Sequence, residues 1–335
     1  MSRTRTAPVA LVPPLSATTR SRAGATGSDT RARGWASVCA YVALTKPRII
    51  ELLLVTTIPT MFVAERGVPG VWLMVATLVG GTLAAGGANA INMVVDRDID
   101  RLMERTKGRP LVTGAMSPRA ALTFAIAIEA VSFAWLWTTV NLLSAVLAVA
   151  ACLFYVFVYT LWLKRTSSHN IVIGGAAGAV PVLVGWSAVT NSLGWAPVLL
   201  FAVIFVWTPP HFWALAFKYR DDYAAANVPM LPVVASFRHT ASRIIAYSVV
   251  MWAMTVAFAW VGHMGALYLV SAVVLGAVFL GYAIALYRAG TGAGQGASAG
   301  AAVSKPAMRL FGWSITYLTL LFAVMAVDQV IAHGH

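Results

Sequence analysis

Charged side chains are scarce in this sequence of 335 residues. Asp, Glu, Lys and Arg together make up 10% of the chain, whereas hydrophobic residues make up 59%. A typical soluble globular domain contains about 25% charged residues, so this composition excludes that class. Long apolar stretches occupy most of the chain instead, and we therefore expect a polytopic membrane protein.

Cysteine and acidic residues are also few. Cys39 precedes the first apolar stretch and Cys152 lies inside a later one, which excludes a disulfide framework. We expect both thiols to be reduced and neither to be catalytic. The 11 acidic residues face 24 Lys and Arg, which gives a formal net charge of +13. In a membrane protein, the loops that carry this excess of basic residues indicate on which side of the membrane each loop lies.

Nine apolar stretches follow the basic N-terminal part of the chain. Each is about 18 to 25 residues long, enough to cross a hydrocarbon core of about 30 Å as a helix. A helix also satisfies its own backbone hydrogen bonds, which a segment in lipid requires. We therefore predict an all-α protein with nine transmembrane helices. The predicted spans are 49–66, 71–95, 119–139, 141–162, 171–190, 195–217, 243–263, 265–287 and 310–331.

The basic residues fall almost entirely on one side of this arrangement. With the N-terminus inside, 23 of the 24 Lys and Arg lie in inside segments, and only Arg66 lies outside. This split is what the positive-inside rule predicts for nine spans, so we expect an inside N-terminus and an outside C-terminus. Six of the 11 acidic residues lie in two of the inside loops. Polar chemistry is therefore expected at one face of the membrane.

Residues 1–37 differ in composition from the rest of the chain. They are rich in Arg, Ser, Thr, Ala, Gly and Pro and contain a single acid, Asp29. We expect a disordered basic tail, followed by one nine-helix domain over residues 38–335. The tail lacks the apolar core of a signal peptide, but its composition also fits an organellar transit peptide.

A row of polar residues ends the second predicted span. Asn92, Asp96 and Asp100 are spaced i, i+4 and i+8, and Asn89 precedes Asn92 by three residues. All four can therefore share one helical face, whereas the spacing turns Asp98 away from it. Solvated ion pairs with neighbouring arginines are the simpler interpretation. Against it, Asn89 and Asn92 lie within the apolar segment, where polar side chains need a partner.

The residues after this face indicate what it holds. Carboxylates on one face repel one another unless a cation lies between them, and Mg²⁺ in proteins is bound by a few carboxylates together with water and substrate phosphates. Lys107 and Arg109 follow directly. We therefore predict a Mg²⁺ site, with Asp96 and Asp100 as metal ligands, that holds a phosphate group at a membrane mouth.

A second polar cluster ends the sixth predicted span. It contains Lys218, Arg220, Asp221, Asp222 and Tyr223, and the prolines that follow it cannot continue a regular helix. An ion pair between Lys218 and Asp222 at i, i+4 is the simple interpretation. Because a first acidic site exists, we favour a second Mg²⁺ site with Asp221 and Asp222 as ligands, facing the first across a cavity.

His211 lies within the sixth span, directly after Pro209 and Pro210. Two consecutive prolines remove two backbone donors, so we expect a break in the helix at the wall of a cavity. His211 would then be an iron ligand, or a hydrogen-bonding group for a flat aromatic substrate. The alternative is a structural histidine bonded to a freed carbonyl group.

Three other ionisable residues lie at the start or in the middle of predicted spans. Lys46 and Arg48 open the first span, either as anchors that reach the membrane surface or as phosphate contacts. Glu129 lies in the middle of the third span, where an acid is expected to face the interior of the bundle. The sequence assigns it no role.

These motifs together resemble the UbiA superfamily of intramembrane prenyltransferases, and within it the heme-modifying branch. The resemblance covers about residues 40–331. One departure is that Ala225 and Ala226 stand four residues after Asp221 and Asp222, where many relatives have a second acid. The matching motifs are TKPR (45–48), NxxxDxxxDRxMxRTxxRPL (92–111), YTxWLKR (159–165), IGGxAGAxPxxxGW (173–186), TPPHFWALA (208–216) and DDYxxAxxPMLPV (221–233).

The resemblance implies a fold, a reaction and partners. The nine helices should surround a central cavity in which Mg²⁺ holds farnesyl diphosphate, with Lys107 and Arg109 stabilising the departing diphosphate. The farnesyl group is then expected to join the vinyl group of heme B, and addition of water gives heme O. Lys164 and Arg165 are expected among the substrate-binding residues. Heme A synthase and terminal oxidase assembly are the implied partners. The composition, with 19 Arg against five Lys and abundant Ala, Val and Gly, indicates a GC-rich genome, so we expect the bacterial plasma membrane rather than the mitochondrial inner membrane.

Two other functions remain open from the sequence. A prenyltransferase that acts on a quinone-precursor ring would keep both acidic sites but would not need the motif around His211. A cation-coupled transporter using Asp96, Asp100 and Glu129 would place its acids near the middle of the membrane, whereas most of the acids here lie at one mouth.

Overall fold

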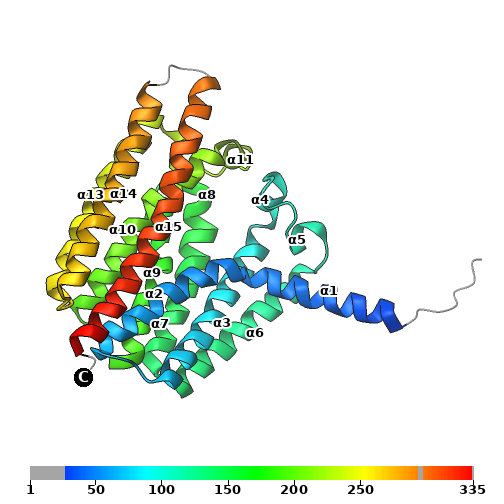
Figure 1. Cartoon of the computed structure of the whole chain (residues 1–335). Helices are drawn as coiled ribbons and strands as arrows, with labels where there is room; N and C mark the ends of the chain where they lie inside the picture. Colours follow the sequence, from blue (N-terminus) through cyan, green and yellow to red (C-terminus); the bar gives the residue numbers. More distant parts are fainter. Residues whose placement is uncertain (1–26, 293–296, 334–335) are drawn as a thin grey trace, which may run out of the picture.

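The computed structural model describes residues 27–292 and 297–333, and all regular structure within them is helical (Figure 1). Side chains are described for residues 35–47, 55–292 and 302–333. The predicted tail lies outside the described residues up to position 26, and residues 27–37 belong to α1. The long helices are α1 (Gly27–Thr45), α2 (Pro47–Glu65), α3 (Val71–Val95), α6 (Pro118–Thr139), α7 (Leu142–Leu153), α9 (Asn170–Thr190), α10 (Trp195–Lys218), α13 (Phe237–Val261), α14 (Ala266–Gly292) and α15 (Ala297–His333).

Eight helical segments of the described chain are long and apolar enough to cross a membrane. They coincide with eight of the nine predicted spans, which confirms an all-helical membrane protein. The ninth prediction, 49–66, coincides with α2, whose side chains are described only in part. The count of nine and the orientation of the termini therefore stay predictions. The eight segments are Val71–Val95, Pro118–Thr139, Leu142–Thr166, Asn170–Thr190, Trp195–Lys218, Phe237–Val261, Ala266–Gly292 and Ala302–His333.

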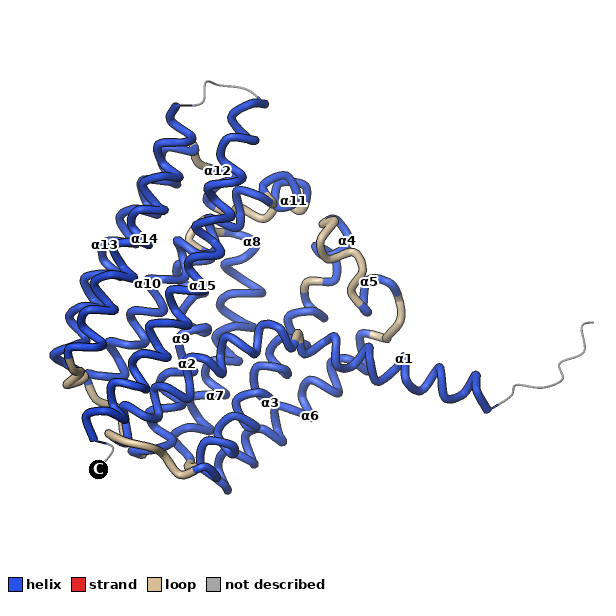
Figure 2. The backbone as a smooth tube through the Cα atoms, viewed as in Figure 1, coloured by secondary structure: helices blue, strands red, loops and turns tan. Residues whose placement is uncertain are grey.

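Short helices cover one end of the bundle. They are α4 (Arg97–Leu102), α5 (Pro110–Thr113), α11 (Arg220–Ala225) and α12 (Leu231–Val234), and Figure 2 shows them together with the loops at this end. The C-terminus lies at the opposite end, and α1 projects sideways from the bundle (Figure 1). Both acidic segments of the sequence therefore lie at the same end of the molecule.

The two acidic segments also pack against each other. Ile99 and Met103 of the first segment share an apolar cluster with Tyr223, Val228 and Met230 of the second. Because these contacts join loops that are more than 100 residues apart in sequence, they hold both segments over the same part of the bundle.

A larger core lies between α10, α13, α14 and α15. Its fully buried aromatic side chains include Phe258, Tyr268, Phe279 and Tyr317. Tyr317 hydrogen-bonds through its hydroxyl to Thr255 Oγ1 at 2.8 Å. Buried hydroxyls that find partners between helices are typical of membrane bundles. These four helices form a densely packed half of the molecule, which supports the half that contains the other helices.

The fourth span contains an unusual segment, η1 (Phe154–Leu163), which joins α7 to the short α8 (Lys164–Thr166). η1 is a π-helix, in which backbone bonds run from residue i to i+5. The Thr160 hydroxyl follows the same spacing and donates to Tyr155 O at 2.8 Å. Segments of this kind occur frequently at functional sites, and this one leads directly into Lys164 and Arg165.

The predicted break at Pro209 and Pro210 is wrong. α10 runs without interruption from Trp195 to Lys218 with both prolines inside it. The neighbouring Thr208 hydroxyl donates to Ile204 O at 2.9 Å. Tight packing against α9, α13 and α15 holds the helix together where its own hydrogen bonds are missing, as neighbouring helices do in membrane proteins.

Candidate active site

A cavity of about 370 Å³ lies between α3, η1, α9 and α10, beneath the short helices. Its polar end is lined by four basic side chains and one acidic side chain, which are Lys46, Arg105, Arg109, Lys164 and Asp100, and the buried Asp96 lies behind this lining. Toward the other end the lining becomes small and apolar, with Gly81, Ala84, Ala85 and Ala148 among its residues. The cavity is therefore built for a molecule with a charged head and a long apolar body.

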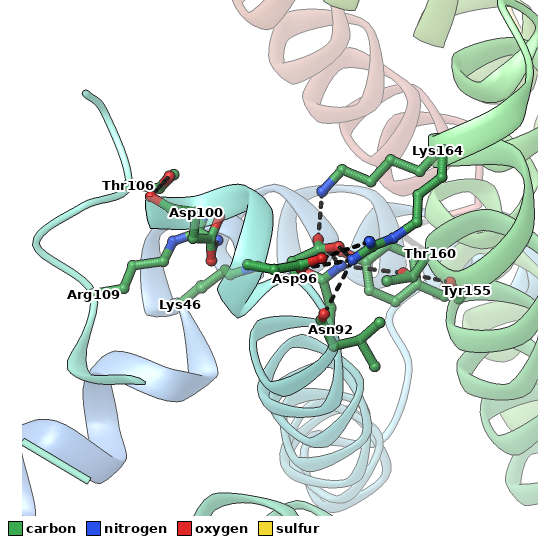
Figure 3. A network of polar contacts seen from close by, with 12 residues as sticks. Lys46, Asn92, Asp96, Asp100, Thr106, Arg109, Tyr155, Thr160 and Lys164 are labelled. Atoms are coloured by element: carbon green, nitrogen blue, oxygen red, sulfur yellow. Dashed lines mark hydrogen bonds and ion pairs between the residues drawn. The ribbon is translucent and has the colours of Figure 1, made fainter. Parts of the chain in front are cut away.

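Asn92 is the centre of the polar end (Figure 3). Its side-chain oxygen Oδ1 accepts a hydrogen bond from Lys46 Nζ at 2.8 Å. Its amide nitrogen donates to Asp96 Oδ2 at 2.7 Å and to Thr160 Oγ1 at 3.1 Å. Three separate segments of the chain thus meet at one side chain that is almost fully buried.

The two carboxylates of this face are each paired with a base. Asp96 is fully buried and forms an ion pair with Lys164, while its Oδ1 has no hydrogen-bond partner and lies 3.8 Å from an Arg165 nitrogen. Arg109 Nη1 lies 2.6 Å from Asp100 Oδ2. The predicted spacing persists although α3 ends at Val95, because the amides of Asp96 and Asp100 still donate to carbonyls four residues earlier.

Lys46 approaches the same cluster from the turn between α1 and α2. Its backbone is left-handed, with φ of 52°. Burial, followed by repulsion from Arg109 and Lys164, lowers the pKa of Lys46 to about 7. Asn89 fixes this turn by donating to Thr45 O at 3.2 Å. The turn therefore carries an amine into the polar end of the cavity.

Asp98 is turned away from this cluster, as the spacing predicts. Its carboxylate takes two hydrogen bonds from Arg165, at 2.7 and 2.8 Å, and these lower the pKa of Asp98 to about 2. Arg165 also donates to Val95 O at 3.1 Å. This pair joins α8 to the end of α3, next to the ion pair between Lys164 and Asp96.

The tyrosines of η1 form one wall of the cavity. Tyr155 and Tyr159 both line it, and their rings are stacked 5.5 Å apart. In a π-helix, residues four and five apart overlie one another more closely than in an α-helix. This places Tyr155, Tyr159 and Thr160 on the side that faces Asn92 and α9.

The glycines of α9 complete the opposite wall. A Cβ at Gly174 would collide with the Tyr159 ring, and one at Gly175 would lie 2.9 Å from Thr208 Cβ. At Gly178 a Cβ would meet nothing within 4 Å, although the residue lines the cavity. The first two glycines allow close packing of helices, whereas the third borders open space.

We expect this difference to separate two variants. Gly178→Leu should fill the cavity and reduce turnover by at least about tenfold while leaving the melting temperature within a few degrees, because its side chain projects into free space. Gly174→Ala should lower the melting temperature instead, since overpacking costs about 1–3 kcal/mol. Thermal melts and initial rates in detergent measure both. Equal melting temperatures for the two variants would contradict the described wall.

Several predicted site residues lie elsewhere. Lys107 is exposed and pairs with Glu104. Asp221 is exposed and Asp222 is half-buried, and neither lines the cavity. Lys218 and Arg220 are exposed as well. No three acids, histidines or cysteines of the described chain are grouped to hold a metal. The side chain of Arg48 lies outside the described residues.

Of the second cluster, Tyr223 alone lines the cavity. It is buried, and burial raises the pKa of its phenol. Arg105, which the sequence analysis did not single out, lies close to Tyr223 and 5.6 Å from the centre of the Tyr219 ring, and it lines the cavity. Its place in the RTxxRPL motif, beside Arg109, was the available signal.

His211 is buried but does not line the cavity. Its Nδ1 lies 2.6 Å from Ser314 Oγ of α15, and its ring is stacked between Trp207 and Phe311. The neighbouring Thr208 and Phe212 line the cavity instead. This environment is that of a packed structural histidine and does not support a role for His211 as an iron ligand.

The polar end suits a magnesium ion. Asn92, Asp96 and Asp100 supply hard oxygen atoms, and Mg²⁺ commonly takes one or two carboxylates and completes its shell with water and substrate phosphates. Asp96 Oδ1 is buried and accepts no hydrogen bond, with an Arg165 nitrogen 3.8 Å away, which leaves this oxygen available as a metal ligand. Lys46, Lys164 and Arg109 stand beside these oxygens, where a phosphate group would lie.

The model of the UbiA prenyltransferase family matches residues 53–315. The chain belongs to this family. Its curated relatives include a protoheme IX farnesyltransferase of Frankia alni, 57% identical over 88% of this chain and 99% of the relative. One of Streptomyces avermitilis is 53% identical over 88% of this chain and 94% of the relative. This chain is therefore a prenyltransferase. Its apolar helices are those of a multi-pass plasma membrane protein.

Solved structures of the UbiA fold agree with the architecture. A digeranylgeranylglyceryl phosphate synthase superposes with a TM-score of 0.70 at 15% identity, over 88% of this chain and 99% of the other. A UbiA homolog from Archaeoglobus fulgidus, bound to DMAPP and Mg²⁺, gives a TM-score of 0.60 at 18% identity, over 86% and 99%. At these identities the likeness establishes the fold of this UbiA family member.

Proposed function

We propose that this enzyme transfers the farnesyl group of farnesyl diphosphate to a vinyl group of heme B, with addition of water, to give heme O and diphosphate. The observation that carries the proposal is the identity of more than 50% with protoheme IX farnesyltransferases over 88% of the chain. The polar end of an otherwise apolar cavity supports it, since it matches the charged head of a prenyl diphosphate.

In this proposal Asp96 and Asp100 hold Mg²⁺, with Asn92 beside them. The bound metal supplies positive charge for the diphosphate oxygens as the bond to the farnesyl carbon breaks. The Lys164 and Arg109 side chains change partners on binding, because the diphosphate offers oxygens in place of the carboxylates with which they are paired. Lys46 adds a donor from the other side of Asn92.

The apolar part of the cavity then protects the reacting carbon. Ionisation of an allylic diphosphate leaves a carbocation that water would quench, so exclusion of bulk water is a requirement of the transfer. Tyr155 and Tyr159 present aromatic faces beside the polar end. An aromatic face attracts a nearby cation, and these two rings would stabilise the farnesyl cation until the vinyl group attacks.

Assay of the purified protein with labelled farnesyl diphosphate and Mg²⁺ tests the proposal. One sample receives heme B and a matched sample receives a hydroxybenzoate. We expect labelled heme whose mass equals heme B plus a farnesyl group and one water. Label in an aromatic lipid, with none in heme, would overturn the proposal in favour of a quinone-precursor prenyltransferase.

The proposed product also defines the setting of the reaction. Heme O serves terminal oxidases directly or as the precursor of heme A, so delivery to heme A synthase or to oxidase assembly is part of the proposal. Both heme and the farnesyl chain partition into lipid, which suits a cavity within membrane-spanning helices.

A further inference from the structure

Glu129 of α6 has no role in the proposed transfer. It lies in the middle of a membrane-spanning helix, its side chain is half-buried, and its Oε1 has no hydrogen-bond partner. An ionisable group at this depth is costly to keep and is commonly functional. The neighbours of its carboxyl group therefore indicate what it does.

The carboxyl group lies against α3 at Gly87. A Cβ at Gly87 would lie 2.6 Å from both Cγ and Oε1 of Glu129, so only glycine leaves room for the carboxyl there. The carboxyl group of Glu129 also lies close to the backbone of Ala88. Since Ala88 lines the cavity, the carboxyl group stands directly behind the cavity wall.

Cys152 of α7 connects this carboxyl group to the cavity. It lies close to the Glu129 carboxyl group and is itself one of the lining residues. Ala88 precedes Asn92 by four residues, which is one helical turn and about 6 Å of rise. The pair thus lies one turn deeper than the diphosphate end, beside the region in which the reacting carbons of the proposed substrates would meet.

Hydration of the heme side chain releases a proton. When water attacks the former vinyl carbon next to the porphyrin ring, a C–O bond forms and one O–H bond of that water breaks. The electron pair of the broken bond stays on the oxygen of the new hydroxyl group. No oxidant or reductant is needed, but a base must take the proton.

We propose that Glu129, acting through Cys152, is the acceptor of this proton. The water proton passes to Cys152 Sγ as the S–H proton passes to the Glu129 carboxylate. The inference rests on the proposed function, because it assigns a residue to the hydration that completes that reaction. From the sequence Cys152 was expected to be inert, and its place at the cavity wall is what changes that expectation.

Variants of both residues test the relay. Glu129→Gln keeps the size of the side chain, and we expect it to lower kcat for heme O formation about 100-fold, within the usual range for loss of a general base. The KM for farnesyl diphosphate should stay within twofold. Cys152→Ala should have a similar effect, whereas Cys152→Ser, whose hydroxyl can pass a proton, should keep most of the activity. Glu129→Asp should restore part of it.

Glu65→Gln is the matched control, because it makes the same chemical change at an exposed carboxyl at the end of α2. Its rates should equal those of the wild type.

Wild-type kcat in Glu129→Gln would overturn the relay while leaving the proposed function intact. A parallel loss in all four Glu129 and Cys152 variants, with lowered melting temperatures, would also overturn it, because packing alone would explain that result. Wild-type protein that forms no hydrated heme would overturn both proposals.

Discussion

Asp96→Ala and Asp100→Ala are each expected to abolish heme O formation, by at least about 1000-fold, while the protein remains folded in the membrane. Both side chains are almost fully buried beside the polar end of the cavity, where Asp100 lines it and Asp96 pairs with the lining residues Asn92 and Lys164. Removing one preorganised charge-stabilising group typically costs about 100- to 1000-fold in rate, and a metal ligand also determines whether the substrate is held. Rates with heme B and farnesyl diphosphate, measured against Mg²⁺ concentration, provide the test.

Asp98→Asn is the control for this experiment. It removes a carboxyl group two residues from Asp96, but one that is exposed and engaged by Arg165 rather than directed into the cavity. Its rate should stay within about threefold of wild type, because surface ion pairs contribute about 0–1 kcal/mol. Near-normal heme O formation by both alanine variants would reject Asp96 and Asp100 as metal ligands.

Lys164→Met is expected to lower kcat/KM for farnesyl diphosphate by about 100-fold or more and to lower the melting temperature as well. Removing one partner of a buried ion pair typically costs about 3–5 kcal/mol, because the other charge is left without compensation. Lys164 is paired with the fully buried Asp96. Added Mg²⁺ should recover part of the stability by supplying Asp96 with a new cation, and a Mg²⁺ titration of the melting temperature measures this.

Arg165→Met provides the comparison at the adjacent position. Arg165 is engaged by Asp98 and by Val95 O at the edge of the site, so we expect its kcat/KM to fall by no more than about fivefold. Equal losses in the Lys164 and Arg165 variants would show that the diphosphate does not distinguish them. In that case the assignment of Lys164 to diphosphate binding would have to be abandoned.

Much of this architecture follows from composition and spacing. Apolar runs of about 20 residues specify helices in lipid regardless of their partners, so the limits of α3, α6 and α9 were predictable within a few residues. The i, i+4, i+8 spacing also anticipated the polar end, because a helical repeat alone puts Asn92, Asp96 and Asp100 together.

The remaining site depends on contacts between helices, which no local pattern encodes. The pairing of Lys164 with Asp96 joins residues 68 positions apart, and the stacking of His211 against Phe311 joins α10 to α15. The continuity of α10 through Pro209 and Pro210 was missed for the same reason. Local chemistry predicts a break there, and only the packing of three neighbouring helices prevents it.

The π-helical segment η1 has a consequence for which changes in chain length this protein tolerates. Deleting a single residue between Phe154 and Leu163 would let the segment relax to the α-helical repeat. A π-helical segment holds more residues per turn than an α-helix, so this change would absorb the missing residue and leave Lys164 close to its direction toward Asp96. A deletion within α7, which is already α-helical, would instead turn everything after it by about 100° around the helix axis and carry Lys164 away from Asp96. The number of residues in this span is therefore less constrained within η1 than within α7.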